Sequence, residues 1–210
     1  MLNAWNTYKQ ALFTKMPSLR DNLNACATLD KLIAAEQALG IRFPIELKEL
    51  YFANNGDDPE AMCGVILGFH FLSLDEVVSE VGHWAELAGK NGFGEDSSFT
   101  SKPEGFIKRQ YANAKWIPIC ADGGGNFIGL DLDPDTKGRV GQIINFGRDE
   151  QHKEVFAYSL NAFFERLTRI VNSDQFYIGE FDGEEVIFLG VDSEDGAHLT
   201  DYLKKEDSVK

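Results

Sequence analysis

Three consecutive glycines stand between an aspartate and an asparagine in the run Asp122-Gly123-Gly124-Gly125-Asn126, which two short apolar segments flank. A glycine-rich loop can hold phosphate groups when a helix begins directly after it, because the free N–H groups of the helix N-terminus bind the anion. Here a strand pattern follows, and no Gly-Lys-Ser/Thr motif comes after the glycines. The sequence therefore predicts a hairpin turn, in which glycine accepts positive φ angles.

The acidic residues after this turn have a spacing that could bind a cation. Asp131, Asp133 and Asp135 match the start of a calcium-binding loop. Thr136 stands where that loop needs glycine, and Gln142 stands where it needs a bidentate glutamate. We therefore expect an acidic hairpin between two strands and no metal site.

A catalytic cysteine would need a neighbouring base, and the sequence pairs none with Cys120, which precedes the glycine turn. Because cysteine is among the residues most often buried, we expect a structural role for Cys120. The histidines are His70, His83, His152 and His198, and none has metal-ligand spacing to cysteine or to another histidine. We expect His70 to be a surface or hydrogen-bonded residue, and the sequence indicates no catalytic residue, metal or cofactor.

Glu36 lies on the apolar stripe of a predicted helix, seven residues after Leu29. A carboxylate that faces inward is costly unless it is hydrogen-bonded or paired. Two roles fit: it accepts backbone N–H groups from a neighbouring loop or helix N-terminus, or it lines a groove that binds a partner. Trp116 is likewise either a core residue or an interface anchor, and we favour the core.

Apolar periodicity, caps and turns predict the elements that position these residues. We expect helices over 3–16, 28–40, 44–54, 73–88 and 159–171, and strands over 65–71, around Trp116, and over 127–132, 140–146, 176–181 and 184–189. Residues 89–114 are predicted to form a long surface connection with a short helix over 105–111. Residues after 191 are predicted to form an acidic segment with one helical turn near Thr200. This order indicates an α+β fold with a largely antiparallel, mixed sheet and helices packed against it.

Alternation in the strand 127–132 places Ile128, Leu130 and Leu132 on one face. Asp131 falls on the other face, opposite the expected core.

The chain has 210 residues, 43% of them apolar, and a net charge of −14. This charge disfavours nucleic acid and anionic membrane surfaces, and it permits a cationic protein partner. No apolar run approaches the ~20 residues that span a bilayer, and the N-terminus lacks the pattern of a secretory signal. Three widely spaced cysteines without a Cys-x-x-Cys pair favour reduced thiols, so we expect a cytoplasmic protein.

The run from Trp116 to Asp131 resembles the signature of the SUKH superfamily, which contains fungal cell-wall-assembly regulators and bacterial toxin-immunity proteins. In that signature, Trp-Ile/Val-Pro-Ile precedes Asp-Gly-x-Gly-Asn and a strand that ends in aspartate. Further matches lie at Glu36, Leu39-Gly40, Phe43-Pro44, Tyr51, Asn55-Gly56 and Gly141-Gln142-Ile143. The resemblance covers roughly residues 28–178. It implies one domain over 1–190, followed by an acidic extension over 191–210.

The resemblance also implies a non-catalytic domain that binds another protein, either as an inhibitor of a nuclease-like toxin or as a related regulatory adaptor. We expect the partner to be basic, to meet an acidic surface that includes Asp57 and Asp58, and to contact residues drawn from Glu36, Tyr51, Asn55, Gly56, Trp116, Asp122, Gly125, Asn126 and Asp131. One alternative is a small-molecule enzyme that uses a groove near Asp122, Asn126 and Asp131. Another is a scaffold protein whose acidic C-terminal segment is the functional part.

Overall fold

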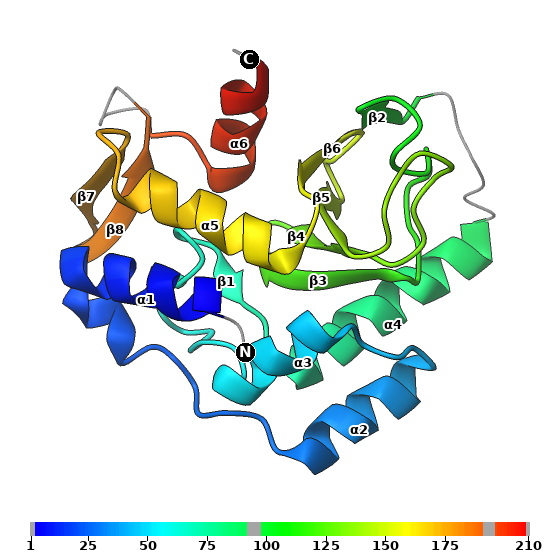
Figure 1. Cartoon of the computed structure of the whole chain (residues 1–210), viewed down its shortest axis with the longest axis horizontal. Coiled ribbons are helices and arrows are strands. Elements are labelled where there is room, and N and C mark those ends of the chain that lie inside the picture. Colours follow the sequence, from blue (N-terminus) through cyan, green and yellow to red (C-terminus); the bar gives the residue numbers. More distant parts are fainter. Residues whose placement is uncertain (1–2, 92–97, 191–195, 209–210) are drawn as a thin grey trace.

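The computed structural model describes residues 3–91, 98–190 and 196–208 (Figure 1). In chain order the elements are α1 (Asn3–Lys15), η1 (Pro17–Arg20), α2 (Leu29–Leu39), α3 (Ile45–Ala53), β1 (His70–Phe71), α4 (Leu74–Asn91), β2 (Thr100–Lys102), β3 (Trp116–Ala121), β4 (Asn126–Asp131), β5 (Gln142–Gly147), β6 (His152–Ala157), α5 (Leu160–Val171), β7 (Phe176–Phe181), β8 (Glu184–Leu189) and α6 (Leu199–Ser208).

The central sheet has six strands in the order β1-β3-β4-β5-β6-β2. Neighbouring strands are antiparallel except β2 and β6, which are parallel. Strands β7 and β8 form a separate antiparallel hairpin. This arrangement confirms the predicted α+β fold with a largely antiparallel, mixed sheet.

Local sequence signals set several helix ends as predicted. The Thr28 side chain accepts a hydrogen bond from the Lys31 N–H, and Gly40 ends α2 in the left-handed conformation. At the start of α4, the Ser73 N–H donates to the Glu76 carboxylate, and the Glu76 N–H donates back to the Ser73 hydroxyl. This reciprocal pair is the predicted capping box.

Helices α1 and α5 pack against each other beside one face of the sheet (Figure 1). Trp5 of α1 contacts Phe164 of α5, with ring centroids 4.8 Å apart, and Phe71 of β1 at 5.5 Å. Ile128 and Leu130 of β4 are buried in the same core cluster, as predicted, and Leu132, which follows β4, is only partly buried against it. The face of β4 that carries these two residues therefore packs into the core.

The opposite face of the sheet is also buried, which the alternation in β4 did not indicate. Trp84 of α4 packs edge-on against Phe127, and the Trp116 ring lies 5.6 Å from that of Phe146. Trp116 is thus a core residue, as expected. Asp131 is fully buried, so its expected place away from the core is wrong: a second apolar layer covers that face.

Four other local predictions differ from the structure. The expected strand 65–71 is reduced to β1, because residues 64–69 fold back on themselves through bridges between Gly64 and Gly68 and between Ile66 and Phe69. Residues 105–111 form turns and no helix, and the connection that contains them includes β2 and the buried Ile107. Strand β6 was not predicted. The expected turn near Thr200 is the full helix α6.

Candidate functional site

The glycine turn between β3 and β4 is held by its own polar residues. The Asp122 carboxylate accepts hydrogen bonds from the Gly124 N–H, the Asn126 N–H and the Asn126 side chain. Asn126 in turn accepts the Asp149 N–H at 2.8 Å. Gly123 and Gly125 have φ angles of 78° and 95°, which fit the predicted hairpin turn. Asp122, Gly125 and Asn126 therefore stabilise the fold at this site.

Asp131 and Trp116 lie on the second buried face of the sheet. The Asp131 carboxylate accepts the Asp133 N–H and the Gln142 side-chain amide, each at 2.9 Å. Burial raises the pKa of Asp131 to about 6, and these two hydrogen bonds oppose the rise. The buried ammonium group of Lys153 lies 5.3 Å from the centre of the Trp116 ring, and burial lowers the pKa of Lys153 to about 8.

The acidic hairpin that follows Asp131 binds amino groups of its own chain. The Asp133 carboxylate accepts hydrogen bonds from Lys108 at 2.7 Å and from Asn113 at 3.0 Å. Across the described residues, no three His, Cys, Asp or Glu side chains come together in an arrangement that could hold a metal ion.

Glu36 joins the end of α2 to the start of α3. Its carboxylate accepts the Phe43 N–H at 2.7 Å and pairs with the Lys48 ammonium at 2.8 Å. The hydrogen bond from Lys48, helped by that from Phe43, holds the pKa of Glu36 below its ordinary value. The side chain is 18% exposed, so it lies at the edge of the core. Its bond to the Phe43 N–H is the backbone contact that the structural role of Glu36 requires.

Tyr51, Asn55 and Gly56 pack around the start of α4. The buried Tyr51 hydroxyl donates to the Leu72 carbonyl, and the Asn55 side chain accepts the Leu74 N–H. A Cβ on Gly56 would come within 2.6 Å of the Ser73 backbone nitrogen, so only glycine fits here. Each of these predicted site residues thus has a structural contact, and their predicted contact with a partner stays a prediction.

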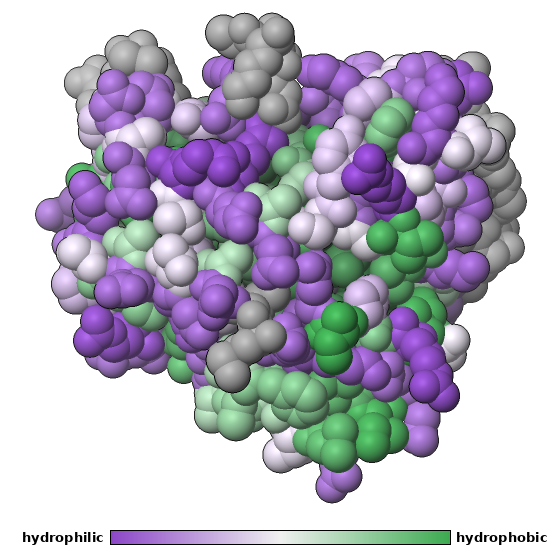
Figure 2. Space-filling view, in the orientation of Figure 1, coloured by the Kyte–Doolittle hydropathy of each residue, from purple (hydrophilic) through white to green (hydrophobic). Residues whose placement is uncertain are grey.

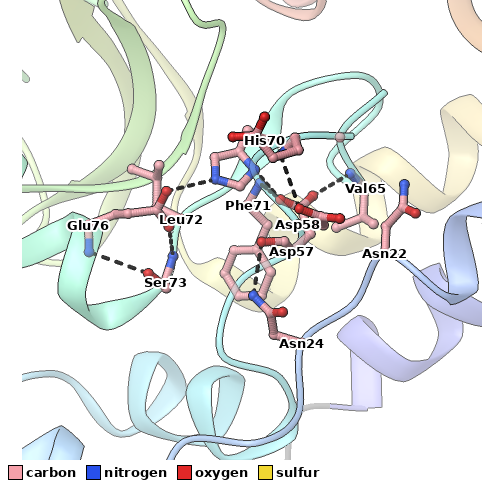
Figure 3. A network of polar contacts seen from close by, with 12 residues as sticks. Asn22, Asn24, Asp57, Asp58, Val65, His70, Phe71, Leu72, Ser73 and Glu76 are labelled. Atoms are coloured by element: carbon pink, nitrogen blue, oxygen red, sulfur yellow. Dashed lines mark hydrogen bonds and ion pairs between the residues drawn. The ribbon is translucent and has the colours of Figure 1, made fainter. Parts of the chain in front are cut away.

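A buried polar network next to these residues was missed by the sequence reasoning (Figure 3). The Asp57 carboxylate is fully buried and accepts the Val65 N–H at 2.7 Å and the Phe71 N–H at 3.0 Å. It also pairs with the His70 ring, whose other nitrogen contacts the Glu76 carboxylate at 3.0 Å. Asp57 was expected on the acidic surface, and that expectation is wrong, because the 64–69 turn and β1 close over it.

The ionisation of His70 follows from this network. Burial by itself would lower the pKa of His70, but the hydrogen bonds and charges of Asp57 and Glu76 outweigh burial and raise it to about 9. A protonated His70 therefore links two carboxylates from different segments of the chain. The sequence did contain one signal for this network: His70 stands six residues before the capping glutamate, Glu76. Strand β1 and the start of α4 bring these two side chains together.

The buried thiols are not prepared for nucleophilic chemistry. Cys120 is fully buried, and burial raises its pKa well above the ordinary value. Burial also raises the pKa of Cys63 to about 11. Because the thiolate is the reactive form, Cys120 has the structural character that we expected.

The outer surface is uneven in polarity. On the face shown in Figure 2, hydrophilic side chains prevail on the left and along the top, and apolar side chains gather at the bottom, over α2 and α3. Exposed apolar residues on these two helices are Leu29, Ile33, Ile45 and Phe52. Of the helices in the described ranges, none is both long and apolar enough to cross a bilayer.

Comparison with known proteins gives consistent family relationships. The model of the SMI1/KNR4 family (SUKH-1) matches residues 26–166. The "cell wall biosynthesis/cell cycle regulator smi1" of Schizosaccharomyces pombe is 30% identical over 188 residues, which cover 85% of this chain and 37% of the relative. The "cell wall assembly regulator SMI1" of Saccharomyces cerevisiae is 27% identical, over 90% of this chain and 44% of the relative.

A "glucan synthesis regulatory protein" of Neurospora crassa is 25% identical over 85% of this chain and 40% of its own length. The chain therefore spans less than half the length of each of these relatives, whose names describe regulators.

Proposed function

Because this chain belongs to the SMI1/KNR4 family (SUKH-1), we propose that it is a non-catalytic regulatory domain that acts by binding another protein. The observation that carries this proposal is its similarity, over 85% of its length or more, to fungal proteins named as regulators of cell wall assembly and glucan synthesis. We propose the corresponding role for this chain: an adaptor in the regulation of cell wall assembly.

The polar contacts support binding over catalysis. Asp122, Asn126 and Asp131, which an enzyme would use under the alternative hypothesis, each bind backbone or side-chain groups of their own chain. A catalytic acid or base has to reach a substrate proton, and the contacts of these residues serve the fold instead. The two buried thiols have raised pKa values, which disfavours their use as nucleophiles.

The net charge of −14 favours a basic partner, because opposite charges steer the encounter of two proteins. A cytoplasmic place of action is part of the same proposal. The names of the relatives favour a regulatory adaptor over an inhibitor of a toxin, and the toxin-inhibitor role stays a prediction from the family resemblance.

A segment exchange tests the proposal. In fission yeast, this chain would replace the segment that it matches in the smi1 regulator, and growth would be measured on an enzyme that digests the cell wall. We expect the chimera to restore growth relative to a strain that lacks the segment. The unaltered regulator is the positive control, and protein abundance is checked by immunoblot. A chimera that is present at normal abundance but grows like the deletion strain would contradict the proposed role.

A further inference from the structure

Two adjoining hollows separate the β7–β8 hairpin from the rest of the domain. One has a volume of about 330 Å³ and lies between the 62–69 turn, β8 and residues 196–199. The other, of about 360 Å³, lies between η1, residues 58–63 and the start of β8. Met62 and Cys63 line both hollows, so the two adjoin and share a wall. We call the two hollows together the hairpin groove.

Specific contacts hold the walls of the hairpin groove in place. The Ser18 hydroxyl of η1 donates to the Glu185 carboxylate at 2.8 Å, which ties the hairpin to the N-terminal part of the chain. The Ala197 N–H donates to the Leu189 carbonyl at 2.9 Å, so residues after the hairpin lie along β8. The Phe188 ring is packed between two glycines: a Cβ on Gly179 or Gly196 would come within 2.5 Å or 2.4 Å of it.

The inner surface of the hairpin groove has mixed polarity, and apolar side chains form part of it. Leu67 and Phe69 are buried there, and Val186 and Phe188 of β8 are half-buried. Large apolar side chains also stand open to solvent at its edge: Phe181 is 62% exposed and Met62 is 46% exposed. Exposed apolar side chains that gather around a depression are typical of a surface that a partner covers.

The charges around the hairpin groove have one sign. Five carboxylates line it, those of Asp58, Glu60, Asp122, Glu184 and Glu185. None of the lining residues that the structure describes is a lysine or an arginine. The sequence itself has no lysine or arginine between Arg169 and Lys204. Four of these carboxylates line the hollow beside η1, and Asp122 lines the other, so a positively charged ligand would be attracted most strongly to the hollow beside η1.

We propose that the hairpin groove binds a basic peptide segment of the partner protein, anchored by one or two apolar side chains. This inference rests on the proposed function and adds the surface and the chemistry of the ligand. The apolar anchors would fill the hollow beside Phe69 and Phe188, and lysine or arginine residues of the same peptide would face the four carboxylates of the adjoining hollow beside η1. A hollow of about 300 Å³ is at the lower end of the range for ligand pockets, which suits single side chains of a peptide.

The test uses a phage-displayed library of random 12-residue peptides, selected on the immobilised full chain. We expect selected peptides rich in lysine and arginine with one or two large apolar residues. Phe181→Ser, and separately Glu184→Gln with Glu185→Gln, should weaken the binding of the synthesised peptides about tenfold. Matched controls are Ile45→Ser, which removes an equally exposed apolar side chain from α3, and Glu104→Gln with Glu165→Gln, which removes two exposed carboxylates outside the groove. These controls should change binding less than twofold.

A direct readout comes from the methionine methyl groups, because the chain has only three methionines. With ¹³C-methyl labelling, the signal of Met62 should shift when a selected peptide binds, and Met62→Leu assigns that signal. The proposal is overturned if the library yields no binder, if the selected peptides are not basic, or if the groove variants bind as tightly as the controls. Each of these results leaves the segment exchange in fission yeast unaffected, so failure of the groove and failure of the regulatory role are distinguishable.

Discussion

Three carboxylates of this chain bind its own backbone. Asp57 accepts two N–H groups from a turn and a strand, Asp122 closes a glycine turn, and Glu36 receives the N–H that leads into α3. Such groups stabilise a fold because a buried N–H without an acceptor costs about 1–3 kcal/mol. Carboxylates are therefore present at these three positions because loops next to them have N–H groups that need an acceptor.

Glu36 allows a direct choice between its two roles. Glu36→Ala removes the acceptor of the Phe43 N–H and the partner of Lys48, so it should lower the free energy of unfolding by about 1–3 kcal/mol. Glu36→Gln keeps an acceptor and should cost less.

Because the pKa of Glu36 is lowered in the folded state, its contribution to the free energy of unfolding is present above the unfolded pKa and is lost as pH falls through the folded value. Urea denaturation at several pH values measures this. An unchanged melting temperature with weaker partner binding would assign Glu36 to the interface.

His70 should make stability depend on pH above neutrality. Its folded pKa of about 9 exceeds its unfolded value, so its contribution is complete at low pH and is lost as pH rises through 9. Between pH 7 and pH 9 we expect a loss on the order of 2 kcal/mol. His70→Gln should remove this loss, and His83→Gln, at an exposed position, should retain it. Because the pKa of Lys153 is lowered to about 8, this residue increases the free energy of unfolding as pH rises above 8. All three proteins contain Lys153, so its effect cancels when their pH profiles are compared. Equal pH profiles for His70→Gln and the unaltered protein would contradict the network in Figure 3.

At the scale of elements, the C-terminal segment contains a helix, α6, that packs on the rest of the domain. Leu199 and Leu203 are buried, and Arg166 of α5 donates to the Leu203 carbonyl at 3.1 Å and to the Glu206 carboxylate at 2.8 Å. Lys204 pairs with Glu150 at 2.6 Å. The helix is thus attached to the domain by apolar and ionic contacts, although its sequence is mainly polar.

Leu203→Ala should therefore lower the free energy of unfolding by about 2–5 kcal/mol, since a fully buried leucine leaves a cavity when it is shortened. Lys205→Ala, at an exposed position of the same helix, should change it by less than about 0.5 kcal/mol. Thermal and urea denaturation of the full chain measure both variants. If Leu203→Ala is neutral, the helix does not pack as described, and the acidic segment acts as a separate extension.

At the scale of the whole molecule, negative charge and apolar surface are unevenly distributed. The last 37 residues carry eleven acids and three lysines, a net charge of −8 out of −14. The β7–β8 hairpin brings part of this charge to the hairpin groove through Glu184 and Glu185. The exposed apolar residues of α2 and α3 do not line this groove. This distribution gives the molecule one side that attracts cations.

Charge and apolar contact should act on different rate constants of binding. For the selected basic peptides, association should slow about tenfold between about 0.02 M and about 0.3 M salt, because the Debye length falls below ~10 Å. Glu184→Gln with Glu185→Gln should mainly slow association, and Phe181→Ser should mainly speed dissociation. Stopped-flow fluorescence with labelled peptides separates the two. Association that is independent of salt would show that charge does not steer this encounter.

The sequence by itself determined the features that depend on neighbours along the chain. Helices appeared where apolar residues repeat with helical spacing, and Thr28, Gly40, Ser73 and Glu76 marked their ends through hydrogen bonds that span three or four residues. The glycine turn was recognised because positive φ is a local property. The family resemblance rested on the same local motifs, which explains why the α+β class was predicted correctly.

Only the tertiary structure decided which residues are buried from both sides and which distant groups meet. Asp131 alternates away from one core, but it is fully buried on the other face of the sheet, where Trp84, Phe127 and Phe146 form a second apolar layer and Trp116 is its neighbour across β3 and β4. Strand β6 escaped prediction because His152, Lys153 and Glu154 make its start polar, although Lys153 is buried against aromatic rings. The network of Asp57 forms within residues 57–76, but it depends on the fold of the 64–69 turn, which the strand pattern did not indicate. The hairpin groove arises between segments far apart in sequence, and no local pattern encodes the distance between them.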